Sequence, residues 1–266
     1  MNVFLVAITR LCTAPALGLL LINSVAFGQS GKDEPGGGVL KQIVEIPLPG
    51  PAVRFDYQSL DAKNGRLYIA HMNADQLVVF DVQKRQVDAQ TNKLIASIQL
   101  GGGAGNTACD AGPGHILVAV HGANELVAIN PAQLKIIGRY KLPGIENPHG
   151  IALDQTNRLA FIAGEENHSL AVFDLNSMKL LSVFQVGDDP DVLAFDPGLS
   201  RLYVSAESGT VTVLEESNRT LHMLGQFHMP HAHTVSVDPK THLVYFPLEN
   251  VAGKPLLRIM EPPKLH

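Results

Sequence analysis

Cysteine and charged residues are both scarce in this chain of 266 residues. Only Cys12 and Cys109 are present, and charged residues make up 17% of the sequence, below the quarter or so that is usual. Acidic residues (25) outnumber basic ones (20), and no run of Lys and Arg occurs. A mildly acidic chain without a basic run does not fit a nucleic-acid-binding protein, so no nucleic-acid partner is expected.

Local motifs of enzyme active sites are also missing. The sequence contains no Gly-x-Ser-x-Gly nucleophile elbow and no phosphate-binding P-loop. Cys109 falls in NTACD, on an expected strand, and is predicted to be a small core residue rather than a nucleophile. Motifs alone therefore leave open whether the protein is an enzyme.

The first 28 residues have the pattern of a secretory signal peptide. Arg10 is their only charged residue, Leu11–Ile22 is apolar, and Ala26-Phe27-Gly28 is a small-x-small cleavage pattern. Twelve apolar residues are too few to span a bilayer, which needs about twenty. We therefore expect a signal peptide (1–28), a flexible linker (29–38, QSGKDEPGGG), no transmembrane anchor after cleavage, and a periplasmic or secreted location.

Cleavage of this segment changes the composition in two ways. It removes Arg10, which leaves 19 basic and 25 acidic residues and a net charge of −6. It also removes Cys12, so Cys109 has no partner for an intrachain disulfide. Exported proteins often carry disulfides, and this one is expected to be stabilised by packing alone.

A repeat of short alternating strands fills the remainder of the chain. Runs such as DVLAF, RLYVSA and TVTVL are separated by DPGLS and ESG, the pattern of antiparallel strands joined by tight turns. Five units each end their first strand at an acidic residue, at intervals of 49, 44, 42 and 42: Asp61, Asp110, Asp154, Asp196 and Asp238. This period predicts an all-β fold, a single β-propeller domain over 39–262 with five four-stranded blades.

The last unit lacks a fourth strand, and an unused strand precedes the first unit. Blade five reads HTVSV, LVYFPL and PLLRIM, after which the chain ends, whereas Val39–Leu48 stands before blade one. We predict that residues 39–48 pair with Pro255–Met260 and complete the last blade. This pairing would cover an edge that is otherwise free to pair with another chain.

One junction departs from the repeat. The turn pattern Asp-x5-aliphatic occurs twice in succession, at Asp81–Val87 and at Asp88–Leu94, ahead of the strand KLIASIQL (93–100) expected as the fourth of blade one. Two interpretations stay open: a loop insertion of six or seven residues, or the loss of whole blades between Val87 and Asp88.

The units resemble YVTN-type propeller repeats. RLYIAHMNADQLVVFD, RLAFIAGEENHSLAVFD and RLYVSAESGTVTVL carry the resemblance, and PHAHTVSVDPKTHLVYFPLEN and KPLLRIMEP look like the C-terminal end of exported YncE-like proteins. The resemblance covers nearly all of residues 39–262 and is specific for fold rather than activity. Such proteins usually have seven blades, which favours descent from a seven-bladed plan by internal loss. The chain has no Trp, so the Trp-Asp dipeptide of WD40 blades is excluded.

Candidate functional residues gather at the start of the first strand of each unit. In a propeller this strand is innermost, so its opening residues converge on one mouth of the axial channel. Five residues before each acidic residue stand Asp56, Gly105, His149, Asp191 and His233. Seven residues before it stand Arg54, Gly103, Asn147, Asp189 and His231.

From these positions we predict a ligand site of seven residues at the axial mouth: Arg54, Asp56, His149, Asp189, Asp191, His231 and His233. The alternatives are a solvent-filled polar channel and a divalent metal held by His149, Asp191, His231 and His233. A second polar set follows the second strands and is expected to be solvated turns or, functionally, a docking surface: His71, His121, Glu165, Glu207 and Glu249.

The function favoured at this point is an exported binding or scaffold protein that holds a small polar ligand or a protein partner at the axial mouth or a loop face. The alternative is a metal-dependent lyase or hydrolase with His149 or His233 as general base. Propellers of both kinds exist, so the fold does not choose between them.

Overall fold

The computed structural model describes residues 40–48, 51–52, 58–61, 66–71, 76–81, 86–88, 100–130, 133 and 135–263. Between 58 and 88, and at Ala104, only the backbone is described. The expected signal peptide and linker, together with Arg54 and Asp56, lie outside these residues. Within them, no helix is long and apolar enough to cross a membrane.

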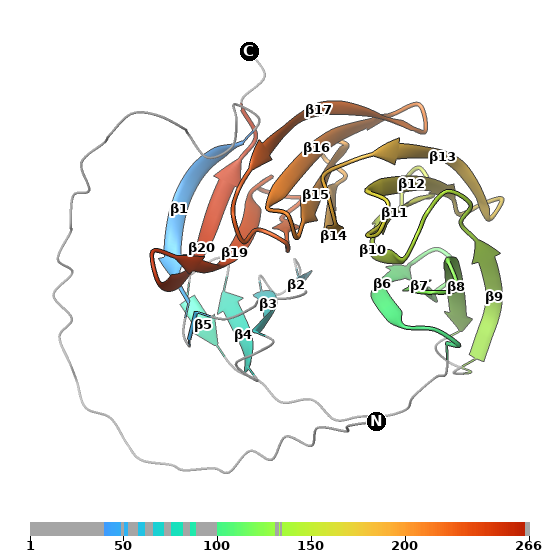
Figure 1. Ribbon diagram of the computed structural model, residues 1–266, viewed down its shortest axis with the longest axis horizontal. Coiled ribbons are helices and arrows are strands. Elements are labelled where there is room, and N and C mark those ends of the chain that lie inside the picture. Colours follow the sequence, from blue (N-terminus) through green and yellow to red (C-terminus); the bar gives the residue numbers. More distant parts are fainter. Residues whose placement is uncertain are drawn as a thin grey trace, which may run out of the picture. The chain divides into compact units, whose positions relative to one another are not determined.

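The described chain forms five four-stranded antiparallel sheets, the blades of a β-propeller (Figure 1). Blades one and two contain, in order, β2 (Gln58–Asp61), β3 (Arg66–His71), β4 (Gln76–Asp81), β5 (Gln86–Asp88), β6 (Ala104–Asp110), β7 (His115–Val120), β8 (Glu125–Asn130) and β9 (Lys135–Lys141). Blades three and four contain β10 (Pro148–Asp154), β11 (Leu159–Gly164), β12 (Ser169–Asp174), β13 (Lys179–Gln185), β14 (Pro190–Asp196), β15 (Arg201–Ala206), β16 (Thr210–Ser217) and β17 (Thr220–His228). Blade five contains β18 (Ser236–Val237), β19 (Val244–Val251), β20 (Lys254–Glu261) and β1 (Lys41–Pro47).

The predicted completion of the last blade by the N-terminal strand is confirmed. Strand β1 pairs antiparallel with β20, with Lys41 opposite Glu261 and Pro47 opposite Leu256. Two ion pairs join the strands, Lys41 Nζ to Glu261 Oε1 at 3.2 Å and Arg258 Nε to Glu45 Oε1 at 2.9 Å. Blade five is therefore built from both ends of the described chain.

Burial along the strands follows their position in the blade. The second strands β11 and β15 are buried at every residue because both faces of the sheet are covered by neighbouring blades. The outer strands β9 and β13 alternate exposed and half-buried residues, as expected where one face meets solvent. Apolar clusters fill the space between blades; one joins Phe161 of blade three to Leu193 and Leu202 of blade four.

The repeated acidic residues act as turn formers and as links between blades. Asp154 Oδ1 accepts hydrogen bonds from the backbone N–H groups of Thr156 and Asn157, which stabilises the turn after β10. Arg158 at the end of this turn makes a bidentate ion pair with Asp110 of blade two. His242 likewise places Nδ1 2.8 Å from Asp196 Oδ2 of the preceding blade.

First strands of successive blades lie side by side: β6 contacts β10, β10 contacts β14, and β14 contacts β18. The approach of β10 to β14 depends on Gly150, where an added Cβ would lie 2.1 Å from the carbonyl oxygen of Asp191. Only glycine permits this contact without displacing the backbone. The close packing brings the opening residues of these strands together.

Two expectations need correction. In the described residues the fourth strand of blade one is Gln86–Asp88, with Phe80 opposite Val87, whereas the sequence predicted this strand at residues 93–100, of which only Leu100 is described. Cys109 is exposed rather than part of the core. It follows Ala108, which packs between blades two and three, and successive residues of a strand point to opposite faces.

Candidate functional site: an axial cluster of histidines and carboxylates

Three first-strand residues meet at the axial mouth as predicted. His149 lies on β10, Asp191 on β14, and His233 just before β18. His149 Nε2 lies 3.0 Å from Asp191 Oδ1, and His233 Nδ1 lies 3.2 Å from Asp191 Oδ2. One buried carboxylate thus joins the imidazoles of blades three and five; Asp191 is 1% exposed and His233 is 5% exposed.

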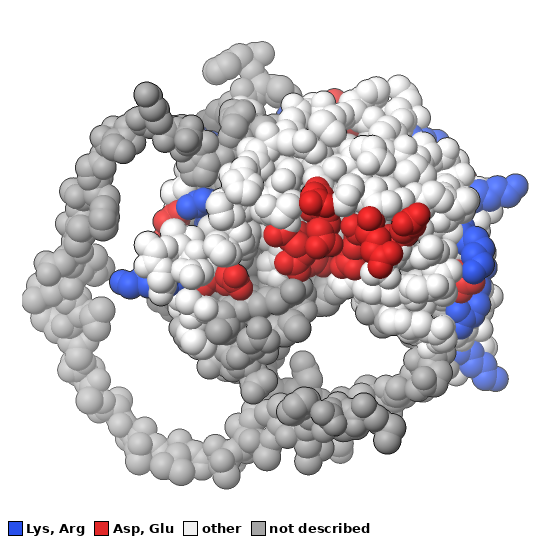
Figure 2. Space-filling model, viewed as in Figure 1, with Lys and Arg blue, Asp and Glu red and all other residues white. Residues whose placement is uncertain are grey.

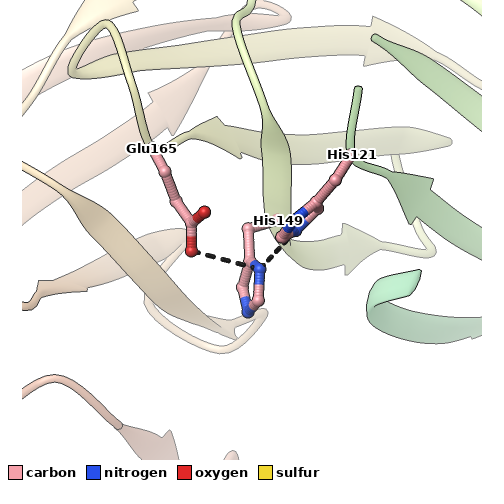
Figure 3. Close-up of side chains that lie close together, drawn as sticks. All are labelled: His121, His149 and Glu165. Atoms are coloured by element: carbon pink, nitrogen blue, oxygen red, sulfur yellow. Dashed lines mark hydrogen bonds and ion pairs between the residues drawn. The ribbon is translucent and has the colours of Figure 1, made fainter. Parts of the chain in front are cut away.

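Residues that follow the second strands extend this cluster. His149 Nδ1 lies 2.5 Å from His121 Nε2 and 3.1 Å from Glu165 Oε1, and the three side chains point toward one another (Figure 3). Glu207 Oε1 lies 3.4 Å from His233 Nδ1. His121, Glu165 and Glu207 had been expected at solvated turns, whereas the structure places them in the same cluster as the first-strand residues.

Strand register is the signal that would have found these residues. Pro148 pairs with Gly164 and Pro190 with Ala206, so each second strand ends beside the start of the first strand. The next residue, Glu165 or Glu207, therefore stands beside the axial residues.

The residues two positions before the axial residues Gly105, His149 and Asp191 also contribute, through their backbone carbonyl groups. The carbonyl oxygens of Gly103, Asn147 and Asp189 accept hydrogen bonds from the N–H groups of His121, Glu165 and Glu207, at 2.8, 3.2 and 2.8 Å. Asn147 and Asp189 adopt the left-handed conformation, with φ of 53° and 57°. These turns hold the second-strand residues in place in three consecutive blades.

The predicted residue His231 does not join the group formed by His149, Asp191 and His233 in the described contacts. Its Nδ1 lies 3.0 Å from Glu249 Oε1, and its side chain is 42% exposed. Asp189 is also exposed, and its N–H donates to His168 Nδ1 at 3.3 Å. Of the four metal ligands predicted from the sequence, His149 and His233 therefore both contact Asp191, while His231 contacts Glu249.

Asp191 and His233 form a charged pair. Burial acts to raise the pKa of Asp191, but hydrogen bonds from His149 and His233 outweigh it and lower this pKa to about 2. Burial acts to lower the pKa of His233, but hydrogen bonds to Asp191 and Glu207 outweigh it and raise this pKa to about 9. The two shifts agree: a carboxylate and an imidazolium stabilise each other in a site with little solvent.

Other groups of the mouth are pushed toward their neutral forms. Burial lowers the pKa of His121, and the nearby His149 lowers it further. Burial raises the pKa of Glu165 against the attraction of His149, and Asp191 and Asp189 raise it further. Asp189 is exposed but partly desolvated beside the cluster, and this desolvation raises its pKa, followed by the charges of Glu207, Asp191 and Asp188. Carboxylates here repel one another, which favours the binding of a cation.

Acidic side chains gather on this face of the molecule, where β10 and β14 lie in Figure 1 (Figure 2). The described mouth segments 144–150, 164–169, 186–191, 206–210 and 229–234 contain no Lys or Arg. Cationic residues of the described chain pair elsewhere, for example Arg158 with Asp110 and Arg139 with Glu125. The mouth thus combines imidazoles with an excess of negative charge.

Two surface pockets are lined by residues other than the histidines and carboxylates of this cluster. One, of about 320 Å³, is lined by residues of blades two and three, including Asp110, Tyr140 and Arg158. The other, of about 470 Å³, is lined by turn residues 123–124 and 141–146. Neither contains a residue of the axial cluster, and the chemistry of the cluster is what marks it as the functional candidate.

Comparison with known proteins yields a similar solved structure but no family. No family model matches the chain, and no curated protein matches it. Selenomethionine-substituted virginiamycin B lyase from Staphylococcus aureus is similar, with 12% sequence identity and a TM-score of 0.47, over 85% of this chain and 75% of that chain. The propeller architecture of this chain rests on the strand pairing described above.

Proposed function

We propose that this chain is an exported, YncE-like β-propeller binding protein that holds a small cationic ligand at its axial mouth. The observation that carries this proposal is the convergence of side chains from four blades: His121, His149, Glu165, Asp191, Glu207 and His233. Binding sites concentrate a few polar groups in a concave region, and an acidic site selects positive charge. A periplasmic or secreted location, expected from the N-terminal 28 residues, would give the mouth access to ligands outside the cytoplasm.

The proposal is tested by ligand-induced changes in thermal unfolding. The protein is screened against diamines, polyamines, amino sugars and, separately, divalent metal ions, with organic ligands measured in the presence of EDTA. A cationic ligand should raise the unfolding temperature of the wild type but not that of the double variant His149→Ala/His233→Ala. If anionic ligands give the larger shifts, or if the double variant keeps the full shift, the axial site is not where the ligand binds.

Location is tested separately. Cell fractionation of the host should recover the protein outside the cytoplasm, and sequencing of its N-terminus should begin near Gln29. Recovery of the intact chain in the cytoplasm would contradict the export part of the proposal without bearing on the mouth.

A second candidate function is a metal-dependent lyase or hydrolase. The observation in its favour is that Asp191 orients both His149 and His233, the arrangement of a general base held by a carboxylate. Any turnover found in a screen of ester and lactone substrates should then be lost in His149→Ala and strongly reduced in Asp191→Asn. Binding without turnover favours the first candidate.

A further inference from the structure

We infer that His121, His149 and Glu165 bind one divalent transition-metal ion of the zinc type, with Asp191 and Asn147 orienting the ligands. The inference rests on the proposed function, because it names the cation that the mouth holds. The three residues come from the turn after β7, from β10 and from the turn after β11. The metal set differs from the one suggested by sequence, since His121 and Glu165 replace Asp191, His231 and His233.

The three donor atoms lie close together. His121 Nε2, His149 Nδ1 and a carboxylate oxygen of Glu165 all lie within 4.8 Å of one another, and Figure 3 shows His121 and Glu165 on either side of His149, both directed at its ring. Two imidazoles and a carboxylate are the ligands of many catalytic zinc sites, with zinc–nitrogen and zinc–oxygen distances of about 2.0–2.2 Å. Such a set leaves a fourth position for water or a ligand atom.

The two ring nitrogens of His149 face different neighbours. Its Nε2 lies 3.0 Å from Asp191 Oδ1. Its Nδ1 lies 2.5 Å from His121 Nε2 and 3.1 Å from Glu165 Oε1. One ring nitrogen is therefore placed beside both other donors, while the other contacts the carboxylate that orients the ring.

Each of the three ligands also contacts a second residue that orients it. His149 Nε2 lies 3.0 Å from Asp191 Oδ1, as in the carboxylate–histidine–metal arrangements that orient a ligating imidazole. Glu165 Oε2 accepts from Asn147 Nδ2 at 3.0 Å, which leaves Oε1 directed at His149. The backbone N–H of His121 donates to the carbonyl of Gly103. Preorganised ligands of this kind bind metal without a large loss of side-chain freedom.

The equivalent position of blade two keeps the site open. At Gly105 an added Cβ would lie 2.9 Å from His149 Cα and 3.1 Å from His121 Nε2. Any larger residue would press on the backbone of His149 and on the imidazole of His121. The glycine among the five equivalent axial positions is therefore explained by the space that His121 and His149 require.

The neighbouring triad of Asp191, Glu207 and His233 also brings its donor atoms within 4.8 Å. It offers one imidazole and two carboxylates, with His233 Nδ1 3.2 Å from Asp191 and 3.4 Å from Glu207, whereas the first triad offers the two imidazoles and one carboxylate found in many zinc sites. Asp191 serves both triads, and its role toward His149 is that of a positioning residue. We therefore assign the metal to the first triad.

Metal titration of the purified protein tests the inference. The protein is prepared without a histidine tag, stripped with EDTA, and titrated with Zn²⁺ by calorimetry and with Co²⁺ by visible absorption. We expect one equivalent of each ion to bind. His121→Ala and Glu165→Gln should each weaken Zn²⁺ binding at least about 100-fold, and Asp191→Asn should weaken it about 10–100-fold.

His231→Gln is the matched control, because His231 contacts Glu249 outside the triad and should keep wild-type affinity. Thermal unfolding of each stripped variant checks that it remains folded, and Glu165→Gln preserves the size of its side chain. Absence of stoichiometric binding overturns the inference, while shifts caused by organic cations would still support the proposed function. Zn²⁺ binding that survives Glu165→Gln but is lost in Glu207→Gln would move the metal to the second triad and also overturn it.

Discussion

The His233–Asp191 pair predicts a specific dependence of stability on pH. The perturbation is His233→Gln, which removes the charge of a residue that is 5% exposed but retains a polar side chain. In the folded protein the pKa of His233 is raised from 6.5 to about 9. At about 1.36 kcal/mol for each tenfold change in proton affinity, this rise corresponds to about 3 kcal/mol of folding stability.

The sign follows from which state holds the proton more tightly. Because the pKa of His233 is higher in the folded state, its contribution is complete below pH 6.5 and disappears as the pH rises through about 9. Asp191, whose pKa falls from 3.8 to about 2, contributes fully above pH 3.8 and loses this contribution as the pH falls through about 2. Both shifts describe one interaction, so they are not added, and the pair is strongest between about pH 4 and 6.5.

The assay is urea unfolding of the wild type and of His233→Gln between pH 5.5 and 10, in buffer with EDTA so that no metal ion contributes. The difference in free energy of unfolding between the two proteins should be largest near pH 6 and smaller by about 3 kcal/mol at pH 10. His231→Gln is the control, since the exposed His231–Glu249 pair is worth about 0.2–1 kcal/mol at most. A difference that stays constant with pH, or grows toward pH 10, would refute the assignment of His233 as the imidazolium partner of Asp191.

Three further predictions concern the scaffold that positions the mouth. Gly150→Ala should destabilise the protein by about 1–3 kcal/mol or more, measured by urea unfolding, because its Cβ would lie 2.1 Å from Asp191 O; an unchanged unfolding midpoint would show that β10 and β14 separate readily. Arg158→Ala should cost about 1–3 kcal/mol, because it leaves Asp110, 3% exposed, without its bidentate partner. Arg158→Lys should restore only part of this loss, since Lys lacks the two-pronged geometry, and full restoration would mean that charge alone matters. Deletion of residues 39–48 should expose the edge of β20 and cause self-association seen by light scattering, whereas a stable monomer would show that β1 is dispensable.

Much of the fold could be predicted from local pattern. Alternating apolar residues and regular turns predict strands, and an acidic residue every 42 to 49 positions predicts five equivalent blades. A spare strand at one end and a missing strand at the other predict the pairing of β1 with β20, which the register confirms. These features can be recognised from the sequence because the same pattern of strands and turns recurs in every blade. The fourth strand of blade one was misplaced because two consecutive copies of one turn pattern compete, and sequence alone does not rank them.

The candidate site, like the fold, was predicted only in part from the sequence. The sequence alone determined which residues open the innermost strands, and hence that His149, Asp191 and His233 converge, because equivalent positions of a repeat occupy equivalent places around the axis. Only the tertiary structure decided that His121 and Glu165 meet His149, and that His231 turns away to Glu249. These contacts depend on register and on left-handed turns such as those at Asn147 and His231, with φ of 53° and 66°. A rotation of the backbone at a turn changes the direction of a side chain, and the spacing of residues in the sequence does not indicate this rotation.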